Sequence, residues 1–258
     1  MAFLSATRRL AVGRLVVLLF STLVLETVIA FPTIANSAPR SFYEDATAFL
    51  KKVVASDGQV NYTVAGREGA ALQMLMQRVQ SFDVARATPS ERKAFYLNAY
   101  NLTVIKAVVA AYPLVSVMKV PGFFDKKPHP VAGELLTLND LENNKLRKVY
   151  TDPRIHFALV CGARGCPRLR PEAYTPATLD AQLTEQARIV LSDPQFIRVD
   201  GSGNKVLVSE IFKWYEADFK ATGKSTLDYI NQYRGSKLIP VTAVIDFYSY
   251  DWTLNDRK

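Results

Sequence analysis

The chain has 258 residues, of which 49% are hydrophobic and 22% charged, a balance that excludes collagen-like, low-complexity and wholly disordered classes. Its 32 Lys+Arg against 24 Asp+Glu give a formal net charge of +8, but the basic residues occur in pairs at most, so no nucleic-acid partner is expected. The length suits one or two domains, and no shift in composition divides it. We therefore expect one.

The N-terminal segment has the order of a secretory signal peptide. Three arginines precede an apolar run over residues 15–25, and small residues follow. Glu26 leaves the run shorter than the ~20 residues of a membrane span. We predict a cleaved signal over residues 1–38 and an exported, periplasmic or secreted domain over residues 39–258 with no stable membrane span. An uncleaved anchor is the alternative.

Helices are predicted at the start of the mature chain, over residues 41–57, 68–79 and 88–112. The third has the clearest start, because Thr88-Pro89-Ser90-Glu91 provides an N-cap, a proline at the first helical position and the glutamate of a capping box. Residues 95–111 are mostly apolar on every side, so this helix should be central.

The middle of the chain mixes loops with short elements. Three prolines and two glycines over residues 115–133 predict a long loop or an irregular hairpin. Thr137 then caps a helix that reaches residue 149. The apolar run 155–160 predicts a buried strand, which ends at the loop 161–167.

The C-terminal part alternates without a regular βαβ period. Helices are predicted over residues 175–191, 209–219 and 225–234, a hairpin over 196–208, and a last strand over 243–248. This order predicts an α+β fold: a single compact domain whose helices pack on a small mixed or antiparallel sheet.

The most informative segment joins a histidine to two cysteines. Cys161 as a nucleophile and His156 as its base would suit thiol-dependent acyl chemistry. Along a regular strand, however, the two side chains point to opposite faces, so they meet only if the strand bends or Cys161 lies past its end, which Gly162 permits.

The alternative for these cysteines is a structural Cys161–Cys166 disulfide, which export would favour. Closing so small a ring contributes only ~2 kcal/mol, so the bond would fix a local loop rather than stabilise the fold. A zinc site from both cysteines with His129 and His156 is disfavoured by the spacing, and we expect no metal and no cofactor.

Two further positions are candidates. Asn98 and Asn101 interrupt a nearly apolar helix, so they either bind loop backbone or orient a catalytic group, and we expect Asn98 to face the segment that carries His156. Glu142 either favours a helix N-terminus or orients His156.

Several motifs occur together and in order. They are Phe95-Tyr-Leu-Asn98-Ala-Tyr100-Asn101, Gly122-Phe-Phe-Asp125, Leu138-Asn-Asp-Leu-Glu142, Arg154-Ile-His156-Phe-Ala-Leu-Val-Cys161 with Cys166-Pro167, and Tyr250-Asp-Trp252-Thr-Leu-Asn255. With them the chain resembles the domain-of-unknown-function family 547 over residues 42 to 255. The resemblance implies one compact domain, found in exported bacterial proteins and in plant and animal chains, and marked by the histidine and both cysteines. The chain also distantly resembles thiol peptidases and transglutaminases, although its order of carboxylate, histidine and cysteine differs from that of papain-type enzymes.

Two function classes follow. As an enzyme, the protein would use Cys161 as nucleophile, His156 as base and Glu142 or Asn98 as orienter on amide or thioester bonds. As a non-catalytic module, it would bind a small-molecule or peptide ligand or respond to redox conditions through Cys161 and Cys166. The state of the thiols discriminates between these classes.

Overall fold

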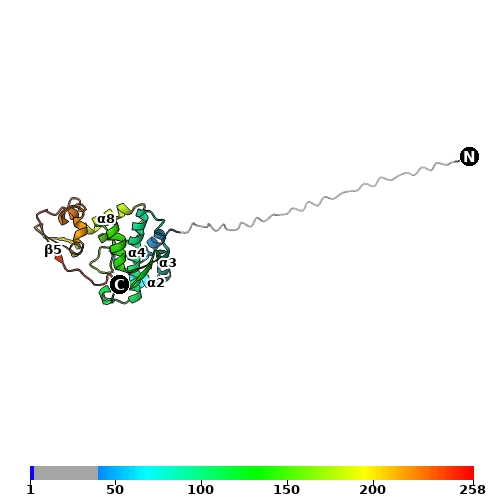
Figure 1. Cartoon of the computed structure of the whole chain (residues 1–258), viewed down its shortest axis with the longest axis horizontal. Helices are drawn as coiled ribbons and strands as arrows, with labels where there is room; N and C mark the ends of the chain where they lie inside the picture. Colours follow the sequence, from blue (N-terminus) through cyan, green and yellow to red (C-terminus); the bar gives the residue numbers. More distant parts are fainter. Residues whose placement is uncertain (3–39) are drawn as a thin grey trace, which may run out of the picture. The chain divides into compact units, whose positions relative to one another are not determined.

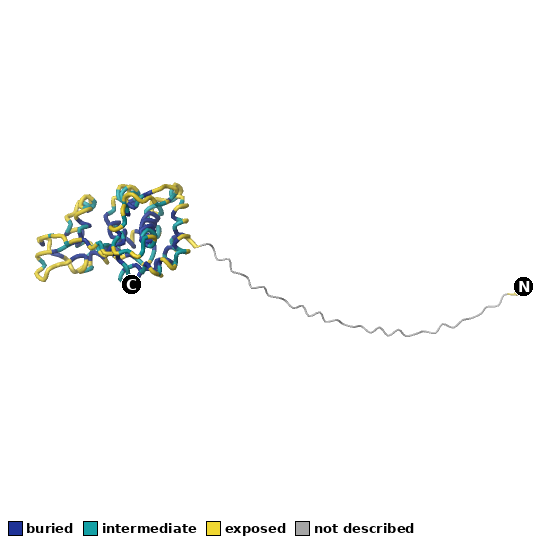
Figure 2. The backbone as a smooth tube through the Cα atoms, turned by 90° about the horizontal axis from the view of Figure 1, so that it is seen from below, coloured by how far each residue is buried: buried dark blue, intermediate teal, exposed yellow. Residues whose placement is uncertain are grey.

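The central element of the fold is α4 (Pro89–Ala111), in a computed structural model that describes residues 1–2 and 40–258. The predicted capping box is present, because the Thr88 hydroxyl accepts from the Glu91 amide and the Glu91 carboxylate accepts from the Thr88 amide. Its length and composition would suit a membrane span, but 72% of its apolar window is buried inside the protein. The expectation of a central helix is therefore confirmed (Figure 2).

Three helices pack around α4 on the N-terminal side (Figure 1): α1 (Phe42–Val53), α2 (Tyr62–Arg67) and α3 (Gly69–Ser81). The first and third were predicted from their periodicity, and α2 was not, because six residues are too few for a helical period. Residues 40–258 form one compact unit. The predicted signal peptide lies outside the described residues, apart from residues 1–2.

A hairpin and an irregular helix follow a short 3-10 turn, η1 (Val117–Lys119). The hairpin joins β1 (His129–Val131) to β2 (Glu134–Leu136). The predicted helix after Thr137 is present as α5 (Leu138–Asp140), the π-helical turn η2 (Leu141–Arg147) and α6 (Lys148–Tyr150). Widened turns of this kind occur often at functional sites, and η2 carries Glu142.

The segment predicted as a buried strand is instead a single helical turn, α7 (Ile155–Ala158), followed by extended residues 159–160. A short apolar run does not distinguish a buried strand from a buried helix by period. Here the Asn101 side chain, rather than a neighbouring strand, pairs with the Ala158 carbonyl and the Val160 amide, at 2.9 Å each. The prediction of a strand was wrong. The argument that strand geometry points His156 and Cys161 to opposite faces therefore does not apply.

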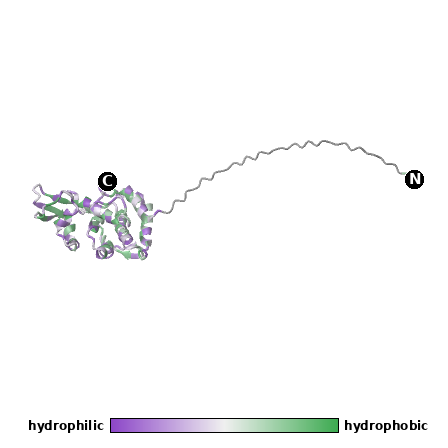
Figure 3. Ribbon diagram, turned by 90° about the horizontal axis from the view of Figure 1, so that it is seen from above, coloured by the Kyte–Doolittle hydropathy of each residue, from purple (hydrophilic) through white to green (hydrophobic). Residues whose placement is uncertain are grey.

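The C-terminal half contains the helix α8 (Leu179–Ser192) and a three-stranded sheet. In the sheet, β3 (Ile197–Val199) pairs antiparallel with β4 (Lys205–Ser209), and β4 pairs parallel with β5 (Val244–Tyr248). The sheet is therefore mixed, and the α+β prediction is confirmed; Figure 3 shows hydrophobic stretches both along the strands and within the helices.

The connection from β4 to β5 holds three short helices, α9 (Ile211–Trp214), α10 (Glu216–Lys220) and α11 (Thr226–Asn231). The predicted helix over 209–219 is interrupted at Tyr215, whose φ of −112° and ψ of 26° leave the helical region. The break turns α10 toward α7, where Asp218 contacts His156.

The core consists of two apolar clusters, one around α4 and one between the sheet and its helices. The segment that carries the candidate residues contributes to both. Ile155 and Ala158 are buried in the helical cluster, whereas Phe157 and Ala163 are buried in the sheet cluster. The candidate site therefore lies where the two clusters meet.

Candidate functional site

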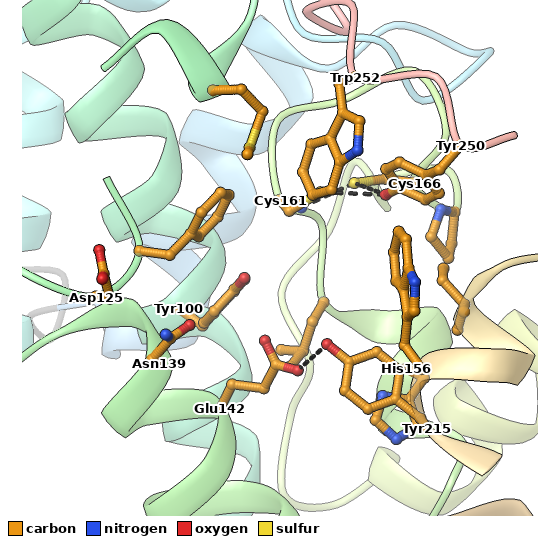
Figure 4. Close-up of a pocket in the computed structure, with 16 residues that line it drawn as sticks. Tyr100, Asp125, Asn139, Glu142, His156, Cys161, Cys166, Tyr215, Tyr250 and Trp252 are labelled. Atoms are coloured by element: carbon orange, nitrogen blue, oxygen red, sulfur yellow. Dashed lines mark hydrogen bonds between the residues drawn. The ribbon is translucent and has the colours of Figure 1, made fainter. Parts of the chain in front are cut away.

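A cavity of about 480 Å³ opens beside the cysteine loop (Figure 4). Its polar lining consists of Asp125, Asn139, Glu142, His156, Cys161 and Cys166. Its aromatic lining consists of Tyr100, Phe124, Trp214, Tyr215, Tyr250 and Trp252. The structure therefore brings three of the four predicted catalytic residues to one cavity.

Both cysteines are free thiols in the structure, so the alternative of a closed disulfide is not what it shows. The Cys166 Sγ accepts the Cys161 backbone N–H at 2.9 Å and the Tyr250 hydroxyl at 3.0 Å. The same hydroxyl lies 3.2 Å from the Cys161 Sγ. The phenol therefore bridges the two sulfurs.

This arrangement makes the two thiols unequal. A hydrogen bond with Cys166, together with burial, raises the pKa of the Cys161 thiol. Burial would also raise the pKa of Cys166, but the hydrogen bonds from Cys161 and Tyr250 outweigh it and lower that pKa. Burial and the neighbouring thiols raise the pKa of Tyr250, so its hydroxyl stays a donor. Cys166 is therefore the thiol of the pair that ionises first.

Two glycines shape the cysteine loop. Gly162 has a φ of +85°, a left-handed conformation that other residues rarely adopt, and it turns the chain after Cys161. Gly165 lies against Tyr250, where a Cβ atom would come within 2.9 Å of the ring. The absence of a side chain at Gly165 thus lets the phenol reach the sulfurs.

His156 is buried, but it forms no hydrogen bond with either cysteine among the described residues. Its Nε2 lies 2.7 Å from an Asp218 carboxylate oxygen. Asp218 also accepts two hydrogen bonds from Arg147, at 2.7 and 3.1 Å. The hydrogen bond from His156, and then that from Arg147, hold the pKa of Asp218 well below its usual range. The ionised carboxylate thus accepts a hydrogen bond from the Nε2–H group and fixes the tautomer of the ring.

Glu142 is linked to this histidine through Tyr215. The Tyr215 hydroxyl donates to Glu142 at 2.5 Å, and the Tyr215 ring stacks on His156 with 4.0 Å between ring centroids. Burial and the charge of Glu142 raise the pKa of Tyr215. The predicted contact of Glu142 with His156 is therefore indirect.

The asparagine of α4 that contacts the His156 segment is Asn101, not Asn98. Asn98 is buried as predicted, but it pairs with the backbone of Tyr174, at 2.8 and 3.0 Å, and does not line the cavity. The prediction that Asn98 faces the His156 segment was wrong. Asn101, one turn later, holds that segment through Ala158 and Val160.

Sequence reasoning missed Asp218, Tyr215, Arg147 and Tyr250 as site residues. Tyr250 belonged to a motif that marked the family resemblance, and that was its only signal. The others lay in segments that were interpreted as core or as solvated helix surface.

Within residues 1–2 and 40–258, no group of three His, Cys, Asp or Glu side chains is placed to hold a metal ion.

Residues 84–189 match the model of a family described as "Protein of unknown function, DUF547". Over this segment the chain is similar to that family. The DUF547 match runs from before α4 into α8 and includes Glu142, His156 and both cysteines, whereas Tyr215, Asp218 and Tyr250 lie beyond it. No curated protein and no solved structure gives a significant match. The distant likeness to thiol peptidases and transglutaminases is not confirmed.

Proposed function

We propose that this protein carries out thiol–disulfide exchange, with Cys166 as the attacking thiolate and Cys161 as the resolving thiol. The observation that carries the proposal is the hydrogen-bonded series from Cys161 through the Tyr250 hydroxyl to Cys166, reinforced by a backbone N–H. A thiolate held by two donors at the wall of an open cavity is the species that attacks disulfides.

The proposed reaction balances with two thiols and one disulfide. The Cys166 thiolate attacks a substrate disulfide, forming a mixed disulfide and releasing one substrate thiolate. Cys161 then loses its proton to the released thiolate and attacks the Cys166 sulfur, which forms the Cys161–Cys166 disulfide and releases the second half of the substrate as a thiolate, which takes a proton from water. A small-molecule thiol reduces the protein again, and the direction of the cycle depends on the redox conditions of the compartment.

Acyl transfer by Cys161 and His156 has less support from the geometry. His156 is hydrogen-bonded to Asp218 and to neither sulfur. The pKa of Cys161 is raised rather than lowered, because it hydrogen-bonds to Cys166. A cysteine nucleophile of the acyl-transfer type needs a base within hydrogen-bond reach and a populated thiolate.

The test is the reaction of the reduced full chain with iodoacetamide and with 2-hydroxyethyl disulfide, followed by mass spectrometry. We expect Cys166 to react first near neutral pH, and Cys161→Ser to trap a mixed disulfide on Cys166. Tyr250→Phe should slow alkylation of Cys166 by about tenfold, if the hydroxyl contributes about 1.4 kcal/mol to the thiolate. Tyr112→Phe, which removes a hydroxyl bonded to Asp256, is the matched control.

Two results would overturn the proposal. One is faster alkylation of Cys161 than of Cys166 in the wild-type protein. The other is failure of the oxidised protein to lose the mass of two hydrogens, because the resolving step must join Cys161 to Cys166.

A further inference from the structure

The lining of the cavity beside the thiols contains two carboxylates but neither lysine nor arginine. Asp125 and Glu142 both line it, and no lysine or arginine does. Figure 4 shows the two carboxylates on the same side of the cavity, across from Trp252. The protein as a whole has a formal net charge of +8, so this lining departs from the general charge of the chain.

Neither carboxylate forms an ion pair with a basic side chain of the described part of the chain. Glu142 accepts only the Tyr215 hydroxyl, and Asp125 forms no ion pair within residues 40–258. The nearby Arg147 is already bound to Asp218, and Lys145 is bound to Glu134. A thiolate at Cys166 would add a third negative charge to the cavity wall.

Aromatic faces form much of the remaining lining. Trp214 and Trp252 stack with their centroids 6.0 Å apart, and Trp252 also lies 6.3 Å from Phe124 and 4.8 Å from Tyr250. The negative face of an aromatic ring attracts cations, most strongly in tryptophan. Carboxylates and aromatic faces in the same lining both favour a positively charged ligand.

Resting on the proposed exchange reaction, we propose that the substrate is a small disulfide that bears a protonated amine or another organic cation. The ammonium group would lie between Glu142, Asp125 and Trp252, while the disulfide reaches Cys166. The same charges repel disulfides that carry carboxylates, so the cavity selects by repulsion as well as attraction.

The test compares three disulfides of similar size with the reduced full chain: cystamine, 2-hydroxyethyl disulfide and 3,3′-dithiodipropionate, which are cationic, neutral and anionic. The rate of mixed-disulfide formation on Cys166, divided by the rate of each probe with free cysteine, corrects for intrinsic reactivity. At low salt we expect the corrected rate to be about tenfold higher for the cationic probe than for the neutral one, and lowest for the anionic probe. Both differences in rate should shrink as added salt screens the charges.

Glu142→Gln and Asp125→Asn should each reduce the ratio of the cationic rate to the neutral rate. Asp125 is exposed, so its variant tests the charge without disturbing packing. Glu134→Gln, which removes a carboxylate outside the cavity, is the matched control and should leave the ratio unchanged.

The outcomes separate the two proposals. Equal corrected rates for the three probes would overturn the cationic substrate and leave disulfide exchange standing. No reaction with any probe would overturn disulfide exchange. In that case the charge preference of the cavity is measured without the exchange reaction. Tetramethylammonium should protect Cys166 from iodoacetamide more than an equal concentration of sodium ions does. Equal protection would overturn the cationic site.

Discussion

Asn101 is the residue that connects the central helix to the segment before the cysteines. Replacing it with alanine leaves the Ala158 carbonyl and the Val160 amide buried without partners. We expect Asn101→Ala to lower the free energy of unfolding by about 1–3 kcal/mol. Thermal and urea denaturation measure this loss.

Two comparisons make the Asn101 result specific. Asn98→Ala should destabilise to a similar degree, because Asn98 binds the Tyr174 backbone, but it should leave thiol reactivity as it is. Asn144→Ala, at an exposed position, should change stability little. Equal thiol reactivity in the Asn98 and Asn101 variants would contradict the role of Asn101 in positioning the loop.

Gly165 gives a second prediction at the residue scale. A Cβ at this position would lie 2.9 Å from the Tyr250 ring and 3.0 Å from the Asp251 amide nitrogen, so the phenol must move away. We expect Gly165→Ala to destabilise the fold by about 1–3 kcal/mol and to slow alkylation of Cys166. Gly69→Ala, where nothing lies within 4 Å of the added atom, is the control. Unchanged alkylation in Gly165→Ala would argue against the bridging hydroxyl.

Asp152 acts at the scale of elements, because it joins α4 to α7. Its carboxylate binds Lys93 on α4 at 2.6 Å and Arg154, the residue before α7, at 2.8 Å. Burial would raise the pKa of Asp152, but the hydrogen bonds from Arg154 and Lys93 outweigh it and lower the pKa to about 2. The carboxylate is therefore held in its ionised form in the folded protein.

The sign of the pH dependence follows from this shift. A carboxylate whose pKa is lower in the folded state stabilises the protein above its unfolded pKa of about 3.9, and the contribution is lost as pH falls toward about 2. The stability difference between wild type and Asp152→Asn should thus be constant from pH 5 to 7 and shrink between about pH 4 and 2. Asp180→Asn, which removes an exposed partner of Arg154, should show a smaller difference. Urea denaturation across this pH range measures both.

Helices whose ends are marked by residues within one turn could be predicted from the sequence. The segments that form the candidate site could be predicted only in part. The start of α4 follows from the capping residues at Thr88 and Glu91, which act within one turn. The shape of α7 depends on Asn101, which lies 57 residues before Ala158 in the chain. Likewise, Asp218 and Tyr250 reach His156 and Cys166 from 62 and 84 residues away. Such contacts leave no periodic pattern in a single sequence.

At the scale of the whole molecule, we propose that the compact unit from Arg40 to Lys258 is the exported form of the chain. The three N-terminal arginines and the apolar run after them support this. Expression of the full chain in a bacterium with a periplasm should give a periplasmic protein that begins near Pro39. N-terminal sequencing and intact mass measure the cleavage, and a product that still begins at Met1 or Ala2 would indicate a membrane anchor.

The separation of Tyr250 from Cys166 along the chain has a consequence for synthesis. Cys166 leaves the ribosome 84 residues before the tyrosine that bridges the thiols. At 5–20 residues per second, this interval is on the order of ten seconds. During that time the nascent chain carries two cysteines without the phenol that makes them unequal. Because β5 leads into Tyr250 and pairs with β4, the asymmetry of the thiols is acquired only after Tyr250 itself has been synthesised.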